Sequence, residues 1–155
     1  MKKISVNKIN LVHVVLGHSY LFYFLALMIG LLADVFIKIR IGGSSNMLIG
    51  FILILLGTSL IYIAQNTSRK AHHRKNDFGY TRFLNGPYKF TRSPTHLGLA
   101  ITMVGLSFVL QSFSLLFCSF LAFLFTRYIF IRKEEKILTE NYGDDYIEYK
   151  KHVRF

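Results

Sequence analysis

The sequence predicts an all-α integral membrane protein. We expect a bundle of about four transmembrane helices, the last two forming a hairpin, followed by a cytoplasmic helical extension at the C-terminus. Hydrophobic residues make up 52% of the 155 residues, and 15 residues are Phe. They gather in runs long enough to cross a bilayer. The Lys and Arg residues behind the formal net charge of +11 flank these runs, which indicates contact with membrane lipid headgroups and no nucleic-acid partner.

Residues 16–37 are the first predicted span. About 20 apolar residues at 1.5 Å each match the roughly 30 Å thickness of the hydrocarbon core. A signal peptide is the alternative, because lysines precede the run, but its apolar core would be shorter and a small-residue cleavage site would follow. Within this span, Asp34 is expected to pair with Lys38, four residues on along the same helix.

A polar turn at residues 38–46 leads into the second predicted span, residues 47–64, so the first two helices are expected to form an antiparallel hairpin. Residues 65–94 are polar and basic and contain Gly79, Gly86 and Pro87, which predicts a loop. Basic residues are dense before the first span and in this loop but sparse between the two spans. By the positive-inside rule, both termini and the loop are cytoplasmic.

Residues 97–131 are apolar again, and as one helix they would measure about 50 Å, more than a bilayer requires. They must fold back, and Gln111, Ser112 and Ser114 mark the turn between a third span at 95–110 and a fourth at 113–131. The third span is short enough that a re-entrant tip is the alternative.

The cytoplasmic tail, residues 132–155, carries six of the eight acidic residues. Gly143 interrupts its helical pattern, and Tyr146, Tyr149 and Val153 form the predicted buried face of a last short helix. We expect this helix to dock as a lid, and the whole chain, residues 1–155, to be a single domain.

The sequence offers little for a metal or a disulfide. Cys118 is the only cysteine, and it lies inside an apolar run. His72 and His73 are adjacent, and neighbouring residues on a helix point in different directions, so a basic interfacial loop is preferred over a metal site.

Two stretches carry a family resemblance: GPYKFTRSPTHLG at residues 86–98, and EEKILTENYGDDYIEYKKHV at residues 134–153. Together they resemble the isoprenylcysteine carboxyl methyltransferase and phospholipid methyltransferase superfamily, in which GxYxxxRHPxYxG precedes a helical hairpin, a Glu pair and FGxxYxxY. Two positions depart from that pattern: the chain has Ser93 where the family most often has His, and His96 where it has Tyr.

The resemblance implies an S-adenosylmethionine-dependent methyltransferase that acts on a lipophilic acceptor, either an isoprenylcysteine-like carboxylate or a lipid amine. Related membrane enzymes suggest an NADPH-dependent sterol-type reductase as an alternative, although this chain is short for that scaffold. A catalytically inactive lipid-binding protein with the same fold is a second alternative, which the departures at Ser93 and His96 keep open. Measurement of S-adenosylmethionine and NADPH binding would separate the three.

The resemblance also implies which residues contact the cofactor. Arg92 supplies a positive charge, and Ser93 with Pro94 is an N-cap and N1 pair that leaves backbone N–H groups for a carboxylate. Glu134 is the favoured hydrogen-bond acceptor. The implied cofactor-binding set is Tyr80, Thr81, Arg82, Phe83, Tyr88, Arg92, Ser93, Pro94, Thr95, His96, Glu134 and Glu135, and the candidate catalytic residues are Arg132 and His96.

Each of these assignments has a plainer alternative. Ser93 could only cap a helix and Arg92 could only meet headgroups. The glutamates could form a solvated acidic face, and Tyr88 could belong to an interfacial aromatic belt rather than stack on adenine. Methyl transfer needs no dedicated base for a carboxylate, but an amine acceptor must lose a proton, for which His96 is a candidate.

Overall fold

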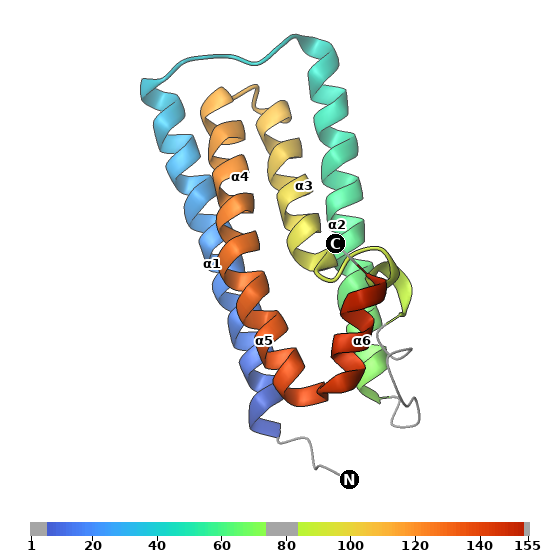
Figure 1. Ribbon diagram of the computed structural model, residues 1–155. Coiled ribbons are helices and arrows are strands. Elements are labelled where there is room, and N and C mark those ends of the chain that lie inside the picture. Colours follow the sequence, from blue (N-terminus) through green and yellow to red (C-terminus); the bar gives the residue numbers. More distant parts are fainter. Residues whose placement is uncertain (1–5, 74–83, 154–155) are drawn as a thin grey trace.

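The computed structural model describes residues 6–73 and 84–153, and within them it contains helices and turns with one isolated β-bridge. Four long helices lie side by side, in the spatial order α1, α4, α3, α2 (Figure 1). Their bounds are α1 at Val6–Phe36, α2 at Ser44–His73, α3 at Pro94–Val109 and α4 at Phe113–Phe125. A 3₁₀ turn, η2 at Gly86–Lys89, precedes α3.

The chain beyond α4 continues as one rod. A single π-helical turn, η3 at Thr126–Phe130, joins α4 to α5 at Ile131–Tyr142. Gly143, with φ of 58°, ends α5, and α6 at Asp144–His152 turns back toward η2 and the start of α3 (Figure 1). We call the end of the bundle that holds η2, α5 and α6 the motif end, because both motifs of the sequence lie there.

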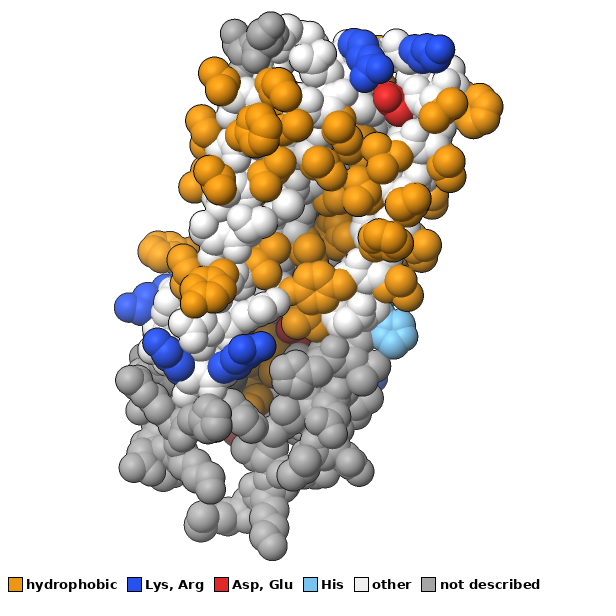
Figure 2. All heavy atoms as spheres, turned by 180° about the vertical axis from the view of Figure 1, so that it is seen from behind, with side chains coloured by type: hydrophobic (Ala, Val, Ile, Leu, Met, Phe, Trp, Pro, Cys, Tyr) orange, Lys and Arg blue, Asp and Glu red, His pale blue; other side chains and the backbone are white. Residues whose placement is uncertain are grey.

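Three of the helical segments are long and apolar enough to cross a membrane: Leu16–Phe36, Asn46–Lys70 and Phe113–Tyr142. By contrast, α3 has 16 residues, which at 1.5 Å each give about 24 Å and fall short of the hydrocarbon thickness. On one face of the molecule, hydrophobic side chains form a broad belt with Lys and Arg above and below it (Figure 2). The predicted all-helical fold is confirmed for the described residues, whereas three segments, and not the predicted four, are long enough to cross a membrane.

The first two helices do not form the predicted packed hairpin. Instead α1 packs on α4 and α2 packs on α3, so that α3 and α4 separate α1 from α2 over most of their length (Figure 1). The prediction of a loop at residues 65–94 was also wrong at its start, because α2 continues to His73. Hydropathy marks where a chain leaves the lipid, whereas a helix can continue into water.

Small residues explain why α2 packs on α3. A Cβ atom added to Gly57 would lie 2.7 Å from the Gly98 carbonyl oxygen, and one added to Gly50 would lie 2.7 Å from that of Gly105. Gly50 and Gly57 are seven residues apart on α2, and Gly98 and Gly105 are seven residues apart on α3. Seven residues are about two helical turns, so the two glycines of each helix lie on the same face and form one stripe. Membrane helices gain stability from such close backbone approach, since lipid provides no hydrophobic drive for their association.

The end of the bundle opposite the motif end is closed by a clasp. The connection between α1 and α2 pairs with the turn between α3 and α4 through an antiparallel bridge of Arg40 and Ser112. The Ser112 hydroxyl donates to Asp34 at 2.7 Å, and Arg40 lies 3.7 Å from the same carboxylate. The predicted pairing of Asp34 with Lys38 is therefore corrected: α1 ends at Phe36, so Lys38 is not on the helix.

Candidate functional site

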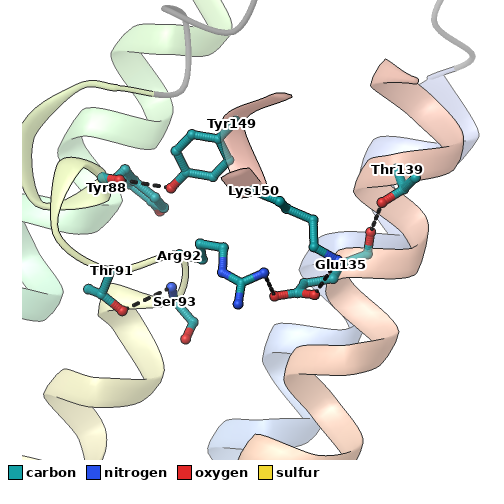
Figure 3. Close-up of polar contacts among 8 residues, drawn as sticks. All are labelled: Tyr88, Thr91, Arg92, Ser93, Glu135, Thr139, Tyr149 and Lys150. Carbon is teal, nitrogen blue, oxygen red and sulfur yellow. Dashed lines mark hydrogen bonds and ion pairs between the residues drawn. The ribbon is translucent and has the colours of Figure 1, made fainter. Parts of the chain in front are cut away.

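The two motifs meet at the motif end of the bundle. Arg92, between η2 and α3, points toward Glu135 of α5, and its Nη1 lies 2.8 Å from Glu135 Oε1 (Figure 3). Lys150 of α6 reaches the other oxygen of the same carboxylate, with Nζ 2.8 Å from Oε2. Arg92 is 43 residues from Glu135 and 58 residues from Lys150 in the sequence, so only the fold of the hairpin brings it to them.

A second ionisable pair lies beside the first. His96 Nε2, in the first turn of α3, is 3.1 Å from Glu134 Oε2. The His96 side chain is almost fully buried, and within the described part of the chain its Nδ1 has no hydrogen-bond partner. A buried polar atom without a partner costs free energy, so His96 Nδ1 is an atom that a ligand or a water molecule would satisfy.

Ser93 and Pro94 occupy the predicted N-cap and N1 positions at the start of α3. The Ser93 side chain caps no backbone group. The N–H groups of Thr95 and His96 lie in the first helical turn, where an α-helix provides no carbonyl to receive them. With Arg92 beside it, this turn is suited to an anionic group.

Tyr88 connects η2 to the rest of the site. Its backbone carbonyl accepts a hydrogen bond from the Tyr149 hydroxyl at 2.8 Å, which ties α6 to η2 (Figure 3). Burial, and secondly the negative charge of Glu134, raise the pKa of the Tyr88 phenol to about 12, while hydrogen bonds with Ser68 and Thr95 oppose this. Burial likewise raises the pKa of Tyr146 and Tyr149 above the usual value of 10.

These phenols make the folded protein sensitive to alkali. Because folding holds Tyr88 protonated, its contribution to stability is fully present below pH 10 and is lost as the pH rises through 12. We expect the melting temperature in detergent to fall above pH 10 and the Tyr88→Phe variant to show a shallower fall. Circular dichroism at graded pH measures this, and parallel curves for the two proteins would contradict it.

The first two helices also contribute polar groups, which the sequence analysis missed. The Gln65 amide of α2 donates to the Tyr20 hydroxyl of α1 at 2.8 Å, and Ser68 contacts Tyr88. A signal was present: Gln65 and Ser68 are three residues apart, on one helical face, directly after an apolar span.

The structure does not bring every predicted residue to this site. Arg132 is exposed, and its guanidinium lies 5.5 Å from the centroid of the Tyr128 ring, so it is not part of the cluster around the two glutamates. Tyr80, Thr81, Arg82 and Phe83 lie outside the described residues. Among the residues that are described, no group of three or more His, Cys, Asp or Glu side chains could hold a metal ion.

An apolar groove runs between α3 and α4 from the motif end toward the clasp. It encloses about 530 Å³ and begins at Leu97, the residue after His96. Ser119 contributes the one hydroxyl of its lining, and Leu53 is contributed by α2. The remaining lining residues are Leu97, Ala100, Ile101, Val104, Phe113, Leu116, Phe117, Phe120 and Phe123.

Fold and site together define a membrane-embedded helical protein with a charged site at one end of its spans and an apolar groove leading away from it. A family model described as phospholipid methyltransferase matches residues 45–145. This is well over half of the chain, and the protein therefore belongs to the phospholipid methyltransferase family of membrane methyltransferases, which confirms the resemblance seen in the two motifs. No curated protein and no solved structure gives a significant match to the chain.

Proposed function

We propose that this protein is an S-adenosylmethionine-dependent methyltransferase of the membrane, which transfers a methyl group to a lipophilic acceptor, either an isoprenylcysteine-like carboxylate or a lipid amine. The observation that carries the proposal is the convergence of Arg92, His96 and the two glutamates at one end of a membrane bundle. The motif end then faces the cytoplasm, where the soluble cofactor is available, as the distribution of basic residues predicts.

The residues present fit the chemistry of the cofactor. Its carboxylate requires positive charge and N–H donors, which Arg92 and the first turn of α3 provide. Its ribose and amino groups require acceptors, which Glu134 and Glu135 provide. Its adenine requires an aromatic or apolar wall, for which Tyr88 is placed. The buried, unpartnered Nδ1 of His96 also fits a site that a ligand completes.

When bound, the cofactor supplies an electrophilic methyl carbon on a positively charged sulfur. The task of the chain is then to align the acceptor with that carbon and to exclude water. Arg92 would hold the carboxylate of the cofactor, Glu134 would accept hydrogen bonds from its ribose or amino groups, and α6 would cover the site from the water side. If the acceptor is an amine, His96 removes its proton, with Glu134 at Nε2 stabilising the imidazolium that forms. A catalytic role of Arg132 stays a prediction.

The groove between α3 and α4 supports a lipophilic acceptor. Its lining is almost entirely apolar and includes Leu97 in the first turn of α3, so a hydrocarbon chain that lies in it would have its polar end toward the motif end of the bundle. A lipid could enter sideways from the bilayer, while the soluble cofactor arrives from the opposite direction. The same groove would serve a lipid-binding protein without activity, which is the second candidate.

Ligand binding and methyl transfer test the proposal. Detergent-purified protein should bind S-adenosylmethionine in isothermal titration calorimetry, and it should transfer labelled methyl groups to a component of a membrane lipid extract. Binding of NADPH in place of S-adenosylmethionine would favour a reductase. Binding of neither nucleotide would favour the lipid-binding protein.

The Glu134→Ala variant gives a sharper test. We expect it to bind S-adenosylmethionine about 10- to 100-fold more weakly, since one hydrogen bond to a charged group contributes about 1.5–3 kcal/mol, and to remain folded. Glu140→Ala, on the exposed side of the same helix, is the matched control and should bind like the wild type. Equal affinities of the two variants would defeat the assignment of Glu134.

A further inference from the structure

The last helix follows α5 after a single glycine and packs through a small apolar cluster of its own. Gly143 alone separates α5 from α6, with φ of 58° and ψ of −128°, and a Cβ atom added to it would meet nothing within 4 Å. Beyond this residue, Tyr146, Tyr149 and Val153 form a small apolar cluster with Leu84, Leu138 and Tyr142. This cluster is separate from the core between α1, α3 and α4.

Polar contacts of Tyr149 and Lys150 link α6 to residues of the two motifs. The Tyr149 hydroxyl donates to the Tyr88 carbonyl, and the Lys150 ammonium pairs with Glu135 (Figure 3). The next residue, Lys151, is exposed. Of these two adjacent lysines, Lys150 is therefore the one aimed at the site.

Glu135 is shared between two cations. Arg92 and Lys150 each lie 2.8 Å from one of its carboxylate oxygens, so neither cation has this carboxylate to itself. The three side chains are 17% to 35% exposed, so water screens their charges only partly. An anionic group at the start of α3 would be attracted to Arg92.

We propose that Lys150 is a positioning residue of the cofactor site and that α6 is a lid hinged at Gly143. With Lys150 on Glu135, the carboxylate is shared, and Arg92 keeps attraction for the carboxylate of the cofactor. Without Lys150, Glu135 pairs with Arg92 alone and the lid loses its ion pair with α5. The proposal rests on the function proposed above, because it assumes that S-adenosylmethionine is the ligand.

Three variants in the full-length protein test the proposal. Lys150→Met should bind S-adenosylmethionine about 10-fold more weakly in calorimetry and raise the KM for it more than it lowers kcat. Lys150→Arg should restore binding, because it retains the charge and reach. Lys151→Met is the matched control and should equal the wild type. Wild-type affinity in Lys150→Met, or equal losses in Lys150→Met and Lys151→Met, would overturn the proposal.

Hydrogen exchange separates this inference from the proposed function. Without ligand, the α6 amides of Lys150→Met should exchange faster than those of the wild type, whereas Lys151→Met should leave their rate unchanged. Adding S-adenosylmethionine to the wild type should slow exchange in α6. If the wild type binds no S-adenosylmethionine, the proposed function fails. The ligand-free comparison of exchange rates still tests whether the Lys150–Glu135 ion pair holds α6 in place. Unchanged α6 exchange in Lys150→Met would overturn the lid.

Discussion

Replacing Arg92 by glutamine is expected to weaken the binding of S-adenosylmethionine by about one to two orders of magnitude. An ionised donor that contacts a carboxylate contributes about 1.5–3 kcal/mol, and every 1.4 kcal/mol is a factor of ten in affinity. The fold should survive, because Glu135 keeps Lys150 as a partner at 2.8 Å. Calorimetry measures the affinity and circular dichroism the fold.

Arg69→Gln is the control for this prediction. Arg69 is exposed on the last part of α2, and its replacement removes one positive charge from the protein as Arg92→Gln does. An equal loss of affinity in both variants would mean that general attraction of the cofactor to a basic surface, and not the geometry of Arg92, explains binding.

The Gly57→Val substitution should have the largest effect on stability. Even the first added carbon would collide with the Thr102 hydroxyl oxygen and would lie 2.7 Å from the Gly98 carbonyl oxygen. The latter is backbone, so α2 and α3 must separate. Overpacking of this kind costs about 1–3 kcal/mol, and at about 2–4 °C per kcal/mol the melting temperature should fall by about 2–12 °C.

Gly17→Val provides the comparison, since a Cβ atom at Gly17 would meet nothing within 4 Å. Both variants place the same side chain in an apolar helix, so they share the change in intrinsic helix preference. We expect the melting temperature of Gly17→Val to stay close to that of the wild type. A similar fall in both variants would show that close packing of α2 on α3 is not what stabilises the bundle.

The helices themselves could be predicted from the sequence because their cause is local. An apolar run in lipid must satisfy its own backbone hydrogen bonds, and a helix does so within one segment. The turn at Gln111 and Ser112, the break at Gly143 and the buried face of Tyr146, Tyr149 and Val153 were all predicted, and the structure contains them.

Which helix packs on which was harder to predict. An apolar composition indicates that a helix lies in lipid, but it does not indicate which other helix it contacts. The predicted pairing of the first two helices was wrong because the glycine stripe of α2 fits that of α3. The predicted pairing of Asp34 with Lys38 was wrong for a related reason: Ser112, 78 residues away, supplies the hydrogen bond.

Residue types and their order along the chain determined the membrane class, the helical segments and the family, because each depends on local composition or on a motif that can be read directly. The tertiary structure alone decided which side chains meet. His96 faces Glu134, and Glu135 lies between Arg92 and Lys150. The first two helices are joined by the hydrogen bond between Gln65 and Tyr20. Contacts between distant residues depend on how helices pack and turn, and packing is a property of the whole bundle rather than of any one segment.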